Sequence, residues 1–277
     1  MFKRTLTRCS VLALVVMFAA GAANAYHIDN FDISQTYKSA RALYRVLGDT
    51  TLGPDAAVYS AASVTLQWPT QFGGQDVSAL QDSLLLQFMM YPGHDADSAI
   101  TTILDHPVHW AEGTLLPVDT VPDGDMVRVL DFSLDIATVG YCDNFIVYRA
   151  DYYSNEGGVH PNFFIQYLNY DICNNRVLSF NDIFAPGNDD ELLKIVGTAL
   201  CDRYYADDFR ELTRKTDIYT DELFVSRDIY LTGDQIVFNY DPYDIAPWAV
   251  GVVEVPVNIR DLVPYLTPEA KTLYHLQ

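Results

Sequence analysis

Apolar side chains recur every third or fourth residue in four stretches of the chain, which is the spacing of one face of a helix. These stretches cover residues 31–48, 76–91, 97–106 and 188–205. Pro92 and Pro107 follow the second and third stretches, where proline stops a helix. In the fourth, Asn188 and Glu191 have the spacing of a capping box, so we predict that this helix begins there.

Alternating apolar and polar residues predict strands in much of the remaining chain. The predicted strands cover residues 64–68, 130–136, 145–153, 162–171, 176–178, 224–231, 235–240 and 250–257. Asn174-Asn175 and Thr232-Gly233-Asp234 supply turn residues between neighbouring strands and predict two β-hairpins. Asn258 is expected to cap a short closing helix.

The helices and the antiparallel strands are segregated along the chain, which is typical of an α+β protein. We expect two lobes, with antiparallel sheets and helices packed on one face. A boundary near residue 155 separates these lobes. The expected parts are an N-terminal helical extension (26–55), a smaller α+β lobe (56–151), a C-terminal domain (152–265) and a C-terminal tail (266–277).

The first 25 residues have the order of a secretory signal peptide: a basic start, an apolar run and a small-residue cleavage site. These features are Lys3, Arg4 and Arg8, then residues 11–20, then Ala23-Asn24-Ala25. We therefore expect a periplasmic or secreted protein that begins at Tyr26. A second run of about 18 apolar residues, the length of a membrane span, does not follow, so no span is expected after cleavage.

Charge narrows the choice of partner. The chain has 17 Lys+Arg against 37 Asp+Glu, a formal net charge of −20. Removing residues 1–25 takes three positive charges and no negative one, which leaves 14 against 37, or −23. Because an acidic surface repels phosphates and attracts cations, nucleic acid is not an expected partner and a basic protein is.

Three cysteines remain after signal cleavage: Cys142, Cys173 and Cys201. An odd number in an oxidising compartment permits one intramolecular bridge at most. Cys142 and Cys173 are the first choice for a disulfide, because both lie in neighbouring predicted strands. The alternative is that all three are small buried apolar side chains.

The stretch from residue 151 to 184 combines several turn and strand signals. Gly157-Gly158 permits a sharp turn that presents His160 on its far side, and Pro161 keeps His160 extended. The runs YYSNEGGVH (152–160), LNYDICNNRVLSFNDIF (168–184) and FNYDPYDIAPWAVGVVEVPV (238–257) resemble the RsiV-like extracytoplasmic domain family. That family includes the lysozyme-sensing ectodomain of a bacterial anti-sigma factor and the non-catalytic region of some peptidoglycan deacetylases.

The resemblance covers roughly residues 152–262, and more weakly 56–151. The anti-sigma factors carry a longer segment before their membrane helix than the ten residues that precede the apolar run here, which puts transmembrane signalling in doubt. The deacetylases add a metal-dependent catalytic domain whose Asp-Asp pair and H-x-x-x-H motif we do not find. The resemblance therefore implies a binding module without a catalytic domain.

Matching the family pattern residue by residue selects Gly157, Gly158, His160, Tyr243, Pro247, Trp248 and Gly251. We expect His160, Trp248 and Tyr243 to contribute to a ligand-binding surface beside the glycine turn, because aromatic side chains give large contact areas at low entropic cost. The alternative is that the glycines only permit turns and the aromatic side chains fill the sheet.

Other motifs give weaker indications of chemistry. His106, His109 and Glu112 have metal-binding residue types, but Pro107 interrupts the helix that would align the two imidazoles. The acidic runs 123–125 and 188–191 do not follow a calcium-loop spacing. We find no G-x-S-x-G elbow and no phosphate-binding loop, and we predict neither a metal nor a cofactor.

We therefore expect a non-catalytic binding protein that recognises a basic protein such as lysozyme, or a cell-wall glycan. One alternative is a cell-wall or carbohydrate hydrolase with a carboxylate-based site, and another is a structural component of the envelope. A hydrolase should show a deep cleft that converges on acids with shifted pKa values. A binding protein should show an exposed aromatic patch instead.

Overall fold

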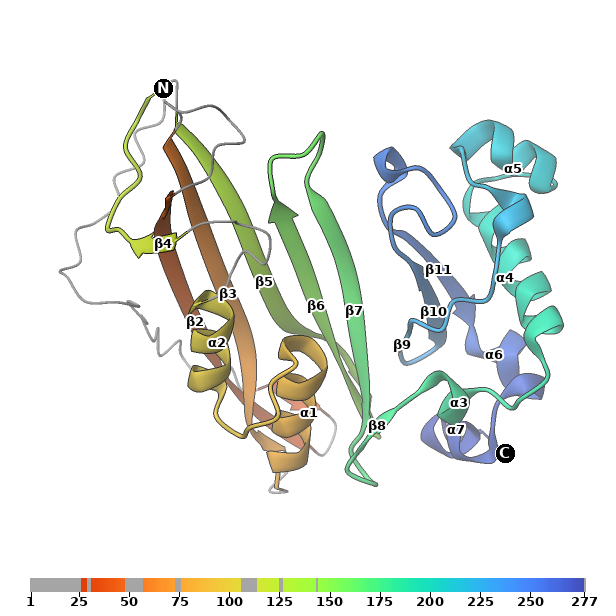
Figure 1. Cartoon of the computed structure of the whole chain (residues 1–277). Helices are drawn as coiled ribbons and strands as arrows, with labels where there is room; N and C mark the ends of the chain where they lie inside the picture. Colours follow the sequence, from red (N-terminus) through yellow and green to blue (C-terminus); the bar gives the residue numbers. More distant parts are fainter. Residues whose placement is uncertain are drawn as a thin grey trace.

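The computed structural model describes residues 26–28, 31–47, 57–72, 76–105, 114–124, 127–142 and 144–276 (Figure 1). The expected signal peptide lies outside these residues. Within them, none of the helices has the length and apolar character needed to span a membrane. The fold combines a large sheet, a smaller sheet and seven α-helices among the described residues, so the predicted α+β class is confirmed.

The large sheet has eight strands in the described chain, in the order β1-β2-β3-β5-β6-β7-β8, with β4 paired to β2. Their bounds are β1 Tyr26–Ile28, β2 Phe31–Leu47, β3 Ala57–Phe72, β4 Thr114–Pro117, β5 Val127–Cys142, β6 Phe145–Asn155, β7 Asn162–Asp171 and β8 Arg176–Leu178. Neighbouring strands are antiparallel except for β3 and β5, which run parallel. A parallel pair needs a crossover connection, which here runs through two helices and β4.

The helix expected over residues 31–48 is wrong: the chain forms strand β2 there and pairs with β3 from Ile33↔Phe72 to Val46↔Val58. The buried residues alternate with a period of two, namely Ala40, Ala42, Tyr44 and Val46. Small alanines carry little weight in a hydrophobic pattern, so the larger Ile, Tyr and Leu side chains made the spacing look helical. Pairing along the full length of β3 decides the conformation instead.

Helices α1 (Ser78–Met89) and α2 (Ala96–Asp105) confirm two predicted helices and cover one face of the large sheet (Figure 1). Leu84 and Phe88 of α1 and Ile100 of α2 are buried in a hydrophobic core with Leu66 and Leu134 of the sheet. This packing buries the side chains on one face of the large sheet.

The C-terminal part forms a three-stranded antiparallel sheet of β9 (Ile229–Leu231), β10 (Gln235–Tyr240) and β11 (Val253–Asn258), covered by helices. The helices are α3 Phe180–Ile183, α4 Asp189–Arg203, α5 Phe209–Thr216, α6 Ile259–Leu262 and α7 Pro268–Leu273, with short 3-10 turns η1 Thr220–Glu222, η2 Trp248–Val250 and η3 Val263–Tyr265. The predicted β9–β10 hairpin is confirmed, although β9 is shorter than expected. Helix α4 packs its buried face against β11.

Both predicted helix starts are confirmed, at Asn188 for α4 and at Asn258 for α6, but only one of the two predicted side-chain caps forms. The cap at Asn258 is confirmed, because its Oδ1 accepts the backbone N–H of Arg260 at 3.0 Å. The capping box at Asn188 is wrong, since the Asn188 side chain donates to the carbonyl of Ala185. A capping box forms instead at Ser179 and Asp182, at the start of α3.

Strands β6 and β7 are buried on both faces, because each face contributes to a different core. Ile146, Tyr148 and Leu168 face α1 and α2, whereas Val147 and Tyr167 face the C-terminal elements. Strand β6 pairs with β7 from Phe145↔Asp171 to Ser154↔Asn162, so the large sheet continues across the boundary expected near residue 155. The chain leaves this sheet only after β8.

A buried amide joins the two sheets. Asn169 of β7 is 4% exposed; its Nδ2 donates to the carbonyl of Ile229 at 2.7 Å, and its Oδ1 accepts the N–H of Leu231 at 2.9 Å. The side chain therefore pairs with the Ile229 carbonyl and the Leu231 N–H of β9, as the backbone of a neighbouring strand would.

We expect Asn169→Ala to lower the free energy of unfolding by about 2–4 kcal/mol, because it leaves a buried N–H and a buried carbonyl unpaired. Urea denaturation measures this change. Asn162→Ala is the matched control on the same strand, where the side chain is exposed and the loss should stay within about 0.5 kcal/mol. Equal losses in the two variants would contradict the bridging role of Asn169.

Candidate functional site

The aromatic residues selected from the sequence come together at one end of the molecule. His160 lies in the loop between β6 and β7, and Tyr243 and Trp248 lie in the loop between β10 and β11 (Figure 1). The His160 ring stacks on Trp248 with centroids 4.2 Å apart, and Phe163 meets Trp248 edge-on with centroids 5.8 Å apart. We call His160, Phe163, Tyr243 and Trp248 the aromatic cluster.

Hydrogen bonds fix the orientation of the His160 ring. Its Nδ1 lies 2.9 Å from the carbonyl oxygen of Pro161, which only accepts, so Nδ1 carries a proton. In the neutral ring, Nε2 therefore accepts the hydroxyl proton of Tyr243, at 3.0 Å. Both ring nitrogens are engaged, which holds the two loops together.

The cluster is accessible at its rim. Tyr243 is 62% exposed and has a positive φ of 77°, an uncommon conformation for a tyrosine. Trp248 is more enclosed, and among the described residues its Nε1 finds no acceptor. Stacking on His160 and Phe163 holds the indole in place despite that unpaired donor.

The two glycines of the turn have different roles. Gly157 has a φ of +82°, and a Cβ there would collide with the guanidinium of Arg128. Gly158 has open space around it: a Cβ there would lie 3.8 Å from its nearest neighbour, the carbonyl oxygen of His160. Of the two, only Gly157 has a backbone conformation that favours glycine, whereas the flexible Arg128 side chain is able to move aside.

We expect Gly157→Ala to lower the free energy of unfolding by about 1–2 kcal/mol, since alanine is strained at positive φ. Gly158→Ala is the adjacent control and should change stability by less than about 0.5 kcal/mol. Thermal or urea unfolding distinguishes the two. A smaller loss for Gly157→Ala than for Gly158→Ala would show that the turn tolerates a side chain at residue 157.

A second feature, which the sequence did not indicate, is a cleft along the free edge of β7. Its volume is about 760 Å³, and its walls come from β7, β8 and the C-terminal elements. Asp241 accepts the N–H of Ile165 at 3.0 Å, and Asp228 accepts the N–H of Tyr167. Carboxylates thus occupy the hydrogen-bonding positions that a further strand would use.

Burial in this cleft raises the pKa of Asp228 to about 6, and the nearby carboxylates of Asp241 and Asp244 act in the same direction. The bonds from the Asn239 amide and the Tyr167 N–H oppose the shift. Burial also raises the pKa of Asp241. The β9–β10 hairpin makes these acids neighbours, but sequence patterns do not show their burial, which follows only when the hairpin packs against β7.

A raised pKa means that the folded protein favours protonated Asp228, so ionisation should destabilise it as pH rises from about 4 to about 7. Relative to Asp228→Asn, the native protein should lose on the order of 2–3 kcal/mol over this range. The Asn239 side chain, whose amide donates to Asp228, is able to flip and pair with the amide that Asp228→Asn introduces, so the substitution leaves no unpaired donor there. Urea denaturation at several pH values measures the difference.

Asp190→Asn, on an exposed position of α4, is the control and should keep the native pH profile. If the free energy of unfolding of Asp228→Asn instead changes with pH as that of the native protein does, Asp228 ionises as an ordinary surface acid.

The thiols of Cys142, Cys173 and Cys201 are free in this structure. The Cys173 thiol donates to the side-chain oxygen of Asn144 at 3.4 Å. Asn144 lies two residues after Cys142, so the β7–β8 turn that carries Cys173 lies beside the β5–β6 turn that follows Cys142. The disulfide stays a prediction.

His106, His109 and Glu112 lie outside the described residues, as does Asp125. In the described ranges, no group of three His, Cys, Asp or Glu side chains is arranged to hold a metal.

Part of the C-terminal region matches a protein family. Residues 181–260 match "Protein of unknown function (DUF3298)". The DUF3298 match spans the whole three-stranded sheet with α4 and α5, and includes Asp228, Tyr243 and Trp248. His160 lies before it, so the aromatic cluster combines residues from within the DUF3298 match and from β6–β7. No curated protein matches the chain in sequence.

Solved structures extend the likeness in fold. A DUF3298 family member from Bacteroides fragilis NCTC 9343 has a TM-score of 0.59 and 19% identity, covering 92% of this chain and 97% of that chain. A DUF3298 family protein from Pseudomonas aeruginosa PAO1 has a TM-score of 0.52 and 17% identity, covering 85% of this chain and 96% of that chain. The fold similarity therefore reaches well beyond residues 181–260.

Proposed function

We propose that this chain is a non-catalytic binding protein of the RsiV-like type and that the aromatic cluster is its recognition surface. The observation that carries the proposal is the convergence of two distant loops on a stacked His160–Trp248 pair with an exposed tyrosine at its rim. Rigid aromatic side chains of this kind dominate the energetics of protein interfaces. Through residues 1–25 we further propose export to the periplasm or the medium.

Binding fits the cluster better than catalysis does. Both nitrogens of His160 have partners, a backbone carbonyl and the Tyr243 hydroxyl, which hold the ring between the two loops. General acid or base catalysis needs a group that can exchange its proton with the substrate. The cluster offers contact area and ring stacking instead.

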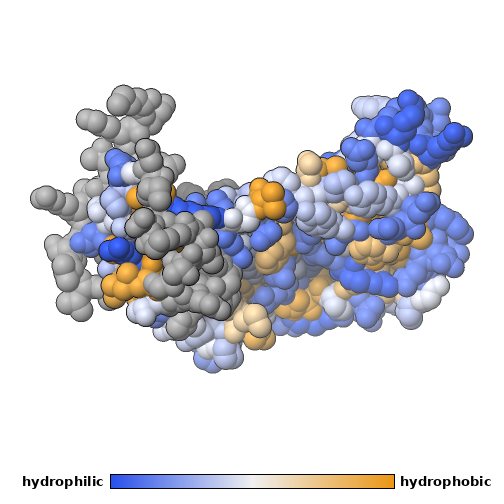
Figure 2. Space-filling view, turned by 45° about the horizontal axis from the view of Figure 1, so that its top comes forward, coloured by the Kyte–Doolittle hydropathy of each residue, from blue (hydrophilic) through white to orange (hydrophobic). Residues whose placement is uncertain are grey.

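The expected partner is a basic protein of the lysozyme type. The net charge of −20 attracts cations, and Figure 2 shows hydrophilic side chains over much of the surface of the C-terminal part. The sequence resemblance to a lysozyme-sensing ectodomain supports the same choice. A cell-wall glycan, which also stacks on aromatic rings, is the other ligand to be tested.

Calorimetric titration of residues 26–277 with a c-type lysozyme tests the proposal at low salt and at about 0.5 M salt, where surface charges are screened. We expect binding that persists at high salt and that weakens at least about tenfold in Trp248→Ala, since central aromatic residues at interfaces contribute about 2 kcal/mol or more. Tyr205→Ala is the control, because Tyr205 is 87% exposed and lies at the end of α4.

Binding that disappears at 0.5 M salt, or that is equally affected in the two variants, would remove the aromatic cluster as a lysozyme site. The same titration with peptidoglycan fragments then tests the glycan.

The β7 edge cleft favours a second candidate function, a hydrolase. An acid with a pKa of about 6 in a cleft of about 760 Å³ has the properties of a general acid. However, Asp228 and Asp241 both accept backbone N–H groups of β7, which commits them to holding the sheets together. Turnover of cell-wall oligosaccharides that is lost in Asp228→Asn, while the fold is retained, would favour the hydrolase.

A further inference from the structure

The outer edge of strand β2 has an unpaired middle section. This strand lies on the side of the large sheet away from the C-terminal part (Figure 1). Strand β1 pairs with its beginning, up to Tyr26↔Ile33, and β4 pairs with its end, from Tyr44↔Pro117. Between them, residues 34–42 pair with β3 on one side and with no described strand on the other. We call residues 34–42 the edge window.

Two hydrogen bonds show which backbone groups of β2 point outward. The carbonyl of Ser34 accepts the hydroxyl of Thr70 on β3, whereas the carbonyl of Leu43 accepts the N–H of Val118, just after β4. Successive residues of a strand direct their backbone groups to opposite sides. The odd-numbered residues of the edge window therefore point their N–H and carbonyl groups away from β3: Gln35, Tyr37, Ser39 and Arg41.

The edge window lacks the usual protection of an edge strand. Natural sheets block free edges with proline, with bulges or with charged side chains that point inward. The window contains no proline, and after the register shift between Ser34 and Gln35 its pairing with β3 is regular. Lys38 is held against helix α2, where its Nζ lies 2.7 Å from Asp97. The window is therefore a regular template for an added strand.

The flanking strands exclude β2 of a second copy as that added strand. Only the edge window of the second copy would itself be unpaired on this side, so the two windows would have to face each other. Strand β2 has 17 residues and would continue past both ends of the window, through the positions that β1 and β4 occupy. A short segment fits, because nine strand residues span about 30 Å.

The edge window is locally basic in an acidic chain. After Asp32, β2 contains no acidic residue, and its neighbour β3 contains no charged residue. Arg41 and Arg45 are exposed on the sheet face opposite α1 and α2, since the buried Ala40 and Ala42 belong to the core beneath those helices. A carboxylate opposite an arginine on a neighbouring strand stabilises the pair.

Arg41 is the group that would select the charge of an added strand. Among the described residues it makes no ion pair. Asp131 and Asp135 of β5 share its sheet face, but β3 lies between, which places them about 10 Å away or more. A carboxylate on a strand that pairs directly with β2 would lie closer to Arg41 than either of these acids.

We propose that the edge window binds an extended segment of a partner protein, about nine residues long, that carries a carboxylate opposite Arg41. Main-chain hydrogen bonds to the outward backbone groups supply the affinity, and the carboxylate sets the register. The window lies at the opposite edge of the large sheet from β7, so this proposal does not depend on the aromatic cluster.

Fluorescence anisotropy of labelled nonapeptides tests the proposal with residues 26–277 at about 0.15 M salt. The probe is TVEVTVEVT with blocked ends, and the charge control is TVKVTVKVT. We expect saturable binding of one probe per chain, at least about threefold tighter than the binding of the control. The net charge of the chain favours the lysine peptide, so tighter binding of the probe reports the local charge of the window.

Backbone methylation separates strand pairing from charge attraction. When the glutamates of the probe face Arg41, their amide N–H groups point toward β2 and those of the valines point away. Methylating the two glutamate amides should therefore weaken binding at least about tenfold. Methylating the two central valine amides should leave binding within about twofold, because these groups take no part in the pairing.

Variants locate the site. Ser39→Pro removes an outward N–H at the centre of the window and should weaken the probe at least about tenfold, while proline is tolerated where the N–H of an edge strand faces solvent. Arg41→Glu should weaken the probe at least about threefold and tighten the lysine peptide. Arg210→Glu, exposed on α5, makes the same change in net charge and should bind both peptides as the native protein does.

Four outcomes overturn the proposal: no saturable binding of the probe, a lysine peptide that binds as tightly, equal binding of the two methylated probes, or equal effects of Arg41→Glu and Arg210→Glu. Circular dichroism checks that each variant is folded. If Ser39→Pro is not folded, the methylated probes and Arg41→Glu decide the question.

Discussion

The structure depends on how the open edge of β7 is satisfied. This strand pairs with β6 along its whole length, but β8 covers only its last three residues, Asn169–Asp171. Along the rest of the edge, Asp241 and Asp228 accept the N–H groups of Ile165 and Tyr167. Where β8 begins to pair, the side-chain amide of Asn169 bridges to β9. Unpaired backbone groups at a buried edge are costly, so these three side chains determine where the C-terminal sheet docks.

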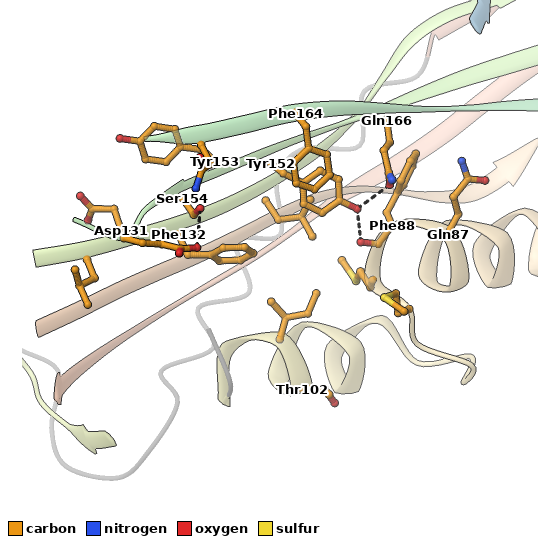
Figure 3. Close-up of a pocket in the computed structure, with 17 residues that line it drawn as sticks. Gln87, Phe88, Thr102, Asp131, Phe132, Tyr152, Tyr153, Ser154, Phe164 and Gln166 are labelled. Atoms are coloured by element: carbon orange, nitrogen blue, oxygen red, sulfur yellow. Dashed lines mark hydrogen bonds between the residues drawn. The ribbon is translucent and has the colours of Figure 1, made fainter. Parts of the chain in front are cut away.

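That docking explains why the candidate sites lie where they do. Because the middle of β6 and β7 is buried on both faces, accessible features are confined to the ends and edges of the two strands. The aromatic cluster lies at the loop between β6 and β7, and the β7 edge cleft follows the free edge of β7. An apolar pocket opens where α1 ends before the sheet does (Figure 3). One pair of strands therefore positions three chemically different surfaces.

The same docking accounts for the bonds that Asp228 makes and for its raised pKa. An acid with a pKa near 6 is often a functional group, but Asp228 acquires this value from the burial that joins the sheets. His160 is likewise engaged at both nitrogens by the contact between two loops. The side chains of Asp228 and His160 thus hold elements of the fold together, whereas the stacked rings of the aromatic cluster retain free faces and edges for contact.

The sequence by itself determined the α+β class, helices α1, α2 and α4, the hairpins, and three residues of the aromatic cluster, His160, Tyr243 and Trp248, because local periodicity, turn residues and a family resemblance carry that information. Phe163 joins the cluster only in the tertiary structure. Tertiary structure alone decided that residues 31–47 form a strand, since pairing with β3 outweighs a spacing that also fits a helix. It also decided that Gly157 and Gly158 differ, that β6 and β7 belong to both cores, and that Asp228 is buried beside Asp241. These features arise from contacts between residues far apart in the chain, which no local pattern encodes.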